Sequence, residues 1–193
     1  MDNVFHACTL PWTVWPWGVD LHHADTDVVP ECSMQFGAMI VRPSQPYEQL
    51  WIRVEFELAG FASAKPHRDD ETLTEVSGYD IVPRRDEHDQ DAHARDEASW
   101  LSSGICPDPK LYFATDSTWL TAERESWAQR LRDSVTAEDA VHFLVDGRDG
   151  YVEILAKGFH WRAWQPGSPR HNEVEGEPIM TGGWTDGASA TFA

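Results

Sequence analysis

The sequence predicts an α+β fold: a mainly antiparallel β-sheet, or a small barrel built from hairpins, with one amphipathic helix packed on it. Three observations predict this fold. Apolar and polar residues alternate between residues 49 and 60, and two apolar segments flank a glycine-containing turn between residues 141 and 156. In addition, residues 119–132 carry apolar side chains at helical spacing.

The first hairpin is expected from residues 34–60. Two sets of side chains alternate along 49–60, namely Leu50, Ile52, Val54, Phe56 and Leu58 against Trp51, Arg53, Glu55 and Glu57. This period of two predicts a strand with one buried and one solvated face. Residues 34–42 are also strand-like, and the connection at 43–46 contains two prolines, so we expect an antiparallel pair.

The second hairpin is expected from residues 141–156. Residues 141–145 and 151–156 are apolar at almost every position, and the connection at 146–150 contains two glycines that suit a tight turn. Strands that are apolar on both faces indicate a central position in a sheet that is covered twice. Alternation resumes at 159–164, which predicts a further strand.

The single predicted helix covers residues 119–132. Leu120, Trp127 and Leu131 would form its apolar stripe, and a polar residue among 116–118 would cap its N-terminus. By contrast, the acidic stretch of residues 65–98 predicts a weak strand around 73–82 and then a long polar loop at 84–97.

The length of 193 residues predicts one globular domain over residues 1–165, which includes the acidic loop region at about 65–98, followed by a loosely held tail at 166–193. Three cysteines without close spacing indicate reduced thiols. No apolar run approaches the length of a membrane helix, and the N-terminus does not read as a secretory signal. We therefore expect a soluble cytoplasmic protein that does not associate with membranes.

The balance of acidic and basic residues favours some classes of binding partner over others. The chain has 33 Asp and Glu against 15 Lys and Arg, a formal net charge of −18. Direct nucleic-acid binding needs clustered cations for phosphate contacts, and the three lysines of this chain are scattered. A surface with this charge instead attracts basic proteins, although the same charge could merely keep the protein dissolved.

Eleven acidic residues and four arginines lie between His67 and Glu97. Charge blocks of this kind are often interaction segments. The sequence therefore favours an acidic module that binds and neutralises a basic protein, as an immunity protein or another inhibitor does, rather than an enzyme. The expected partner-binding residues are Asp69, Asp70, Glu71, Asp86, Glu87, Asp89 and Asp91, with Trp12, Trp15 and Trp17 as apolar anchors.

The ten tryptophans leave two interpretations open, because aromatic side chains dominate cores and interfaces alike. The alternative function is a small-molecule or carbohydrate-binding protein, or a hydrolase, with a tryptophan-lined cavity. Its site would consist of Trp51, Glu55 and Glu57, which share one strand face. Two carboxylates near an aromatic platform suit glycoside chemistry, but in a glycosidase they flank the substrate.

No cofactor is expected. His22, His23 and Asp25 are side chains of metal-binding type, but neighbouring histidines of an extended chain point to opposite sides. Cys106 is followed by Pro107 and Pro109, which predicts a rigid turn rather than a nucleophilic thiol.

Overall fold

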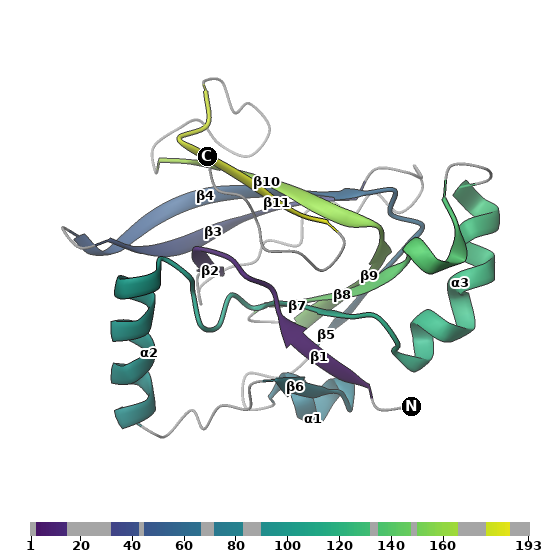
Figure 1. Ribbon diagram of the computed structural model, residues 1–193, viewed down its shortest axis with the longest axis horizontal. Coiled ribbons are helices and arrows are strands. Elements are labelled where there is room, and N and C mark those ends of the chain that lie inside the picture. The colour runs from purple at the N-terminus through teal and green to yellow at the C-terminus, as the bar shows by residue number, and fades with distance from the viewer. Residues whose placement is uncertain are drawn as a thin grey trace.

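The computed structural model of the 193-residue chain describes residues 3–14, 32–42, 45–66, 72–82, 90–131, 135–147, 150–165 and 177–185. These residues form an α+β fold with two open sheets and three α-helices (Figure 1). Neither sheet closes on itself, so the barrel alternative is wrong, whereas the mainly antiparallel α+β class is confirmed.

The first sheet has six strands in the order β5-β9-β8-β7-β1-β6. Their bounds are β1 Val4–Ala7, β5 Phe61–Pro66, β6 Asp80–Val82, β7 Leu111–Ala114, β8 Val141–Asp146 and β9 Gly150–Ala156. Strands β1 and β6 run parallel, and the other described neighbours run antiparallel. The predicted hairpin of residues 141–156 is the β8–β9 pair, and its two strands are buried on both faces.

The second sheet has five antiparallel strands in the order β11-β10-β4-β3-β2. Their bounds are β2 Trp12–Val14, β3 Cys32–Arg42, β4 Gln45–Glu57, β10 Gly158–Trp164 and β11 Met180–Thr185. The predicted first hairpin is the β3–β4 pair, in which Phe36 lies opposite Ile52. Strand β11 extends the sheet along β10, and its Trp184 is buried, so this part of the C-terminal segment belongs to the packed structure.

The main core lies between the two sheets. Strand β4 contributes Ile52, Val54 and Phe56, whereas β8 and β9 contribute Phe143 and Ile154 from the opposite side. These side chains are at most 4% exposed. The alternation that predicted β4 is therefore the pattern that places every second side chain in this core.

Helix α3 (Thr118–Leu131) is the helix that the sequence predicts, and its Leu120, Trp127 and Leu131 are buried as expected. Ser117 caps it, because its Oγ accepts a hydrogen bond from the Leu120 amide at 3.1 Å. The Trp127 indole donates to the Leu58 carbonyl at 3.2 Å, which fixes the helix against the connection between β4 and β5.

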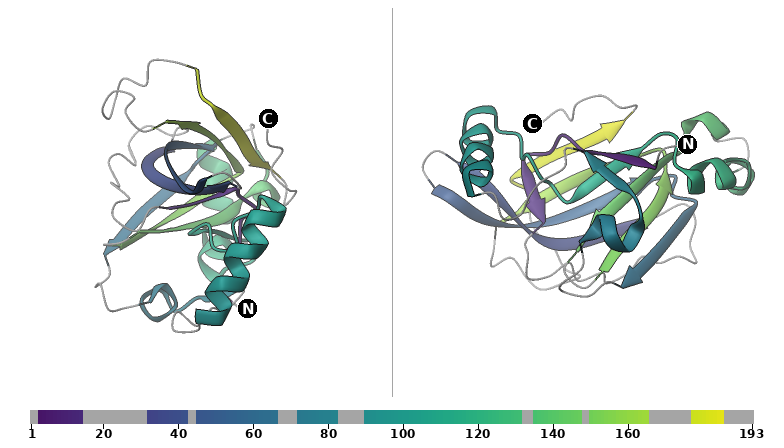
Figure 2. Two further views of the ribbon diagram at one scale, coloured as in Figure 1. Left: turned by 90° about the vertical axis from the view of Figure 1, so that its left-hand side faces the viewer. Right: turned by 90° about the horizontal axis from the view of Figure 1, so that it is seen from below.

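The prediction of a single helix is not confirmed, because two further helices lie in the acidic stretch. Helix α1 (Leu73–Ser77) stands where we expected a strand; Thr72 and Glu75 form a capping box, and Gly78 ends the helix in the left-handed region at φ 70°. Helix α2 (Gln90–Ser103) replaces most of the expected loop at 84–97. Helices α2 and α3 lie at opposite ends of the long axis (Figures 1 and 2).

A short 3₁₀-helix at Ala137–Asp139 precedes β8. Within the described ranges, no helix has both the length and the apolarity needed to cross a membrane.

Gly60 should be intolerant of a side chain. A Cβ built on it would overlap the indole of Trp127, and its amide donates to the Leu155 carbonyl at 3.0 Å, so the backbone is held in place. We expect Gly60→Ala to lower the free energy of unfolding by about 1–3 kcal/mol through overpacking, measured by urea denaturation.

Gln129→Ala, on the exposed face of α3, is the control for Gly60→Ala. The control should change stability by less than about 0.5 kcal/mol. Equal stability of the two variants would mean that Trp127 can move away at no cost.

Candidate functional site

A groove of about 790 Å³ lies between α2, the α1–β6 segment and the ends of β7 and β8. This volume is typical of ligand sites. The described residues that line it are Ala7, Thr13, Tyr47, Thr72, Leu73, Thr74, Ile81, His93, Asp96, Glu97, Trp100, Pro107, Asp108, Lys110, Tyr112 and Asp146. The groove is therefore built from segments that are distant in the sequence.

The wall formed by α2 is acidic. Asp96 and Glu97 both face the groove from this helix. Glu97 contacts the hydroxyl of Tyr47, a β4 residue whose side chain is 56% exposed at the rim. Burial and this carboxylate together raise the pKa of Tyr47, so the phenol remains a hydrogen-bond donor at neutral pH.

Trp100 fixes the position of this wall. Its indole donates to the Pro11 carbonyl at 2.9 Å, and its ring packs with Val41 and Cys106. It is the one buried residue of α2, a helix that the structure describes in full. The other residues of α2 are exposed or partly exposed.

The floor of the groove holds two further carboxylates around a lysine. The Lys110 ammonium lies 3.3 Å from the Asp108 carboxylate and 3.3 Å from the Asp146 carboxylate. Burial alone would lower the pKa of Lys110, but the two aspartates outweigh it and raise that pKa. Lys110 therefore stays charged, and its backbone has a φ of 60°, which is uncommon for a residue with a side chain.

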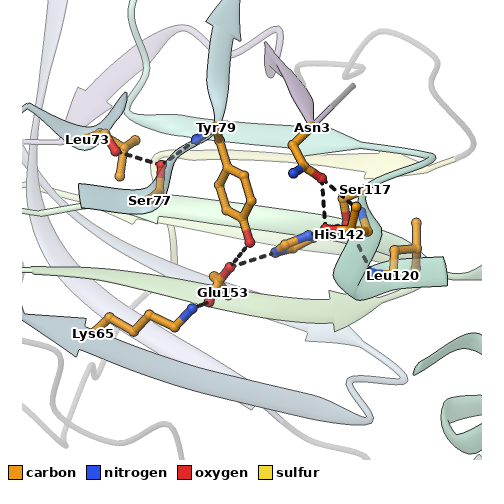
Figure 3. A network of polar contacts seen from close by, with 10 residues as sticks. Asn3, Lys65, Leu73, Ser77, Tyr79, Ser117, Leu120, His142 and Glu153 are labelled. Carbon is orange, nitrogen blue, oxygen red and sulfur yellow. Dashed lines mark hydrogen bonds and ion pairs between the residues drawn. The ribbon is translucent and has the colours of Figure 1, made fainter. Parts of the chain in front are cut away.

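A second polar cluster lies near α1 and α3, and it is buried except for the Lys65 side chain, which is 46% exposed (Figure 3). The Glu153 carboxylate accepts a hydrogen bond from the Tyr79 hydroxyl and forms an ion pair with Lys65, although Glu153 is only 2% exposed. Burial lowers the pKa of Lys65, but Glu153 outweighs it and raises that pKa above the usual value. This arrangement satisfies a carboxylate that would otherwise be costly to bury.

The same cluster contains Ser117 and His142, whose Oγ and Nδ1 atoms are 2.7 Å apart, while His142 Nε2 is 3.6 Å from Glu153. The residue types match those of a hydrolytic triad. Their environment does not, because Ser117 and His142 are fully buried and the Ser117 hydroxyl caps α3. The His142 ring is also flanked by the rings of Phe5, Tyr79 and Trp119, so we assign this cluster a structural role.

The structure separates the predicted site residues. Trp12 is fully buried against Phe36 and Trp161, so it is a core residue and not an exposed anchor. Asp91 is exposed in the first turn of α2, beside the groove-lining residues but not among them.

The alternative site lies on the outer face of β4, where Trp51 is 40% exposed. Its carboxylates are already engaged: Glu55 is 3.0 Å from Arg53 and 2.8 Å from Arg162, and the Glu57 carboxylate contacts Nε2 of His160. The remaining predicted partner-binding residues lie outside the described ranges, namely Asp69, Asp70, Glu71, Asp86, Glu87, Asp89, Trp15 and Trp17. The residues of metal-binding type, His22, His23 and Asp25, also lie outside these ranges.

Sequence reasoning missed most of the residues that form the groove. The acidic residues of α2 belong to the stretch that we identified as acidic, and the proline-flanked segment before β7 was expected to be a rigid turn. Nothing in the sequence, however, indicates that Asp108 and Asp146 meet, because their proximity follows from the pairing of β7 with β8.

No group of three or more His, Cys, Asp or Glu side chains suited to a metal ion occurs among the residues that the structure describes. Comparison with known proteins found no matching family model, no matching curated protein and no matching solved structure.

His142 should make stability depend on pH. Burial, together with the charge of Lys65, lowers the pKa of His142 from 6.5 to about 3 in the folded protein. The unfolded chain therefore takes up a proton below pH 6.5 that the folded chain does not, so stability falls as the pH drops from 6.5 towards 3. The expected contribution of this one group is about 1.4 kcal/mol per pH unit within that window.

We expect His142→Gln to remove this contribution, which urea denaturation at pH 7, 6, 5 and 4 would show as a shallower loss of stability than in the wild type. His93→Gln, on the exposed face of α2, is the matched control and should keep the steeper slope. Parallel slopes for all three proteins would show that His142 does not remain neutral when folded.

Proposed function

We propose that this protein binds and neutralises a basic protein partner through the acidic groove, in the manner of an immunity protein or another inhibitor. The observation that carries the proposal is the convergence of Asp96, Glu97, Asp108 and Asp146 on one groove. Its described lining contains Lys110 and His93 as the groups that can carry positive charge. The groove is thus electrostatically complementary to a cationic segment.

The net charge of −18 supports the same partner at longer range. A strongly negative molecule attracts a basic one before contact and accelerates association, and this effect weakens with salt. Cys8, Cys32 and Cys106 are buried thiols, and we propose the reducing cytoplasm as the place of action because thiols persist there.

Aromatic residues line the groove in addition to the charged ones. The rings of Tyr47, Trp100 and Tyr112 lie among its lining residues, and aromatic side chains supply much of the energy of protein interfaces. Among the residues that the structure describes, Tyr47 is the most exposed large hydrophobic residue. We therefore expect it to contact the partner directly.

The carbohydrate alternative remains a prediction. Contacts with Arg53, Arg162 and His160 already engage the two glutamates that it requires. The groove carboxylates explain binding of a basic partner more directly.

Removing the charges of α2 should weaken binding of a basic probe. We expect the double variant Asp96→Asn/Glu97→Gln to bind a fluorescein-labelled nona-arginine peptide at least about tenfold more weakly than the wild type, measured by anisotropy at low salt. The matched control is Glu123→Gln/Glu125→Gln on α3, which removes the same charge at the opposite end of the molecule.

If charge at any position were sufficient, the two double variants would lose affinity equally, and the groove would not be the binding site. The association rate of the wild type should also fall at least about tenfold between low and high salt. A rate that is insensitive to salt would remove the electrostatic basis of the proposal.

A further inference from the structure

Exposed apolar side chains gather beside the acidic wall that α2 forms. Leu101, in the last turn of α2, is 37% exposed, and Ile105, which follows the helix, is 38% exposed. Tyr47 on the rim of the groove is more exposed than either. Isolated exposed apolar residues need no explanation, but apolar residues that gather in one place indicate an interaction surface.

Helical spacing places Leu101 next to Tyr47. Glu97 and Trp100 line the groove from α2, and Leu101 follows Glu97 by one helical turn. Because Glu97 contacts the Tyr47 hydroxyl, Tyr47 and Leu101 lie on the same side of this helix.

Ile105 lies at the same end of α2 because the chain turns there. Gly104 ends the helix at a φ of 71°, and its amide donates to the Trp100 carbonyl at 2.8 Å. The side chains of Trp100 and Cys106 then pack together, so their sequence neighbours Leu101 and Ile105 lie near each other at the surface. We give the name apolar rim to three residues, Tyr47, Leu101 and Ile105.

The apolar rim adjoins the carboxylates of α2. Protein interfaces commonly combine an apolar contact with surrounding polar groups, and apolar anchors supply much of their binding energy. The carboxylates of Asp96 and Glu97 are complementary to a cationic group, whereas the rim is complementary to an apolar one. An occupant that matches both must carry the two kinds of side chain close together.

The spacing within α2 sets the distance between these two side chains. Leu101 lies about 6 Å beyond Glu97 along the helix axis, since each residue rises about 1.5 Å. Two residues of an extended segment span about 6–7 Å and point to the same side. A basic residue and a large apolar residue two positions apart would therefore face Glu97 and Leu101 together.

We infer that the apolar rim binds a large apolar side chain of the basic partner, beside a lysine or arginine that the carboxylates of α2 attract. This inference rests on the proposed function of the groove and adds the chemistry of the bound segment. That segment is extended and amphipathic, with the basic and the apolar residue two positions apart. Charge alone then gives a weaker complex than charge with an apolar anchor.

The test compares two fluorescein-labelled peptides by anisotropy at low salt. One is the nona-arginine probe, and the other has the same nine arginines with two leucines at each end. We expect the wild type to bind the leucine-flanked peptide at least about tenfold more tightly than nona-arginine, because the rim buries leucine side chains. Equal affinity of the wild type for the two peptides would overturn the inference without the use of any variant.

The double variant Leu101→Gln/Ile105→Gln should lose this preference. Glutamine is a good helix former, so the substitution at Leu101 preserves α2. We expect the preference for the leucine-flanked peptide to fall below about threefold, while the affinity for nona-arginine stays within about twofold of the wild-type value. Urea denaturation checks that the variant is folded.

The matched control Val82→Gln/Ile179→Gln removes two apolar side chains of similar exposure, 38% and 43%. Neither residue lines the groove. Val82 follows the lining residue Ile81 on β6, so its side chain points to the opposite face of that strand. The control should keep the wild-type preference, and an equal loss in both double variants would contradict binding at the rim.

A second copy of this chain is the other possible occupant of the rim. If sedimentation shows a wild-type dimer that Leu101→Gln/Ile105→Gln dissociates, while the peptide preference does not change, the rim joins copies of the chain and the inference is wrong.

The two proposals fail in different ways. If Asp96→Asn/Glu97→Gln binds nona-arginine as tightly as the wild type, the proposed function of the groove is wrong. If that variant loses affinity while the wild type shows no preference for the leucine-flanked peptide, the groove binds cations but the rim holds no apolar anchor.

Discussion

Apolar contact between the inner faces of the two sheets is the interaction on which the rest of this structure depends. Phe56 of β4 packs against Phe143 of β8 with ring centroids 5.5 Å apart, and Phe159 of β10 lies 5.5 Å from the same ring. Burying side chains of this size contributes about 1.5–3 kcal/mol each. Because stability comes from this interior, the chain tolerates a net charge of −18.

The elements that face this interior could be predicted from the sequence. Alternation along β4 and the apolar strands β8 and β9 are direct consequences of burial, and the stripe on α3 follows the same logic at helical spacing. Helices α1 and α2 could not be predicted in this way. Helix α1 has five residues, of which Leu73 and Val76 contact the apolar cluster around Phe5, and a single tryptophan anchors α2. Neither helix therefore has an apolar pattern long enough to predict it.

The acidity of the candidate site could be predicted from the sequence, but most of the residues that form it could not. The acidic stretch that we identified does supply Asp96 and Glu97, yet Asp108 and Asp146 come from segments whose pairing no local pattern encodes. Trp12 shows a different limit, because an aromatic residue between prolines suits a core position as well as an exposed anchor, and Trp12 is fully buried.

The anchoring of α2 has a consequence for how the groove can change its width. Trp100 lies near the C-terminal end of this helix, and the turns before it expose mostly polar side chains. Fraying or tilting of those first turns would uncover little apolar surface and would therefore require little free energy compared with global unfolding. One side of the groove can thus change its position while the double-layered interior remains unchanged.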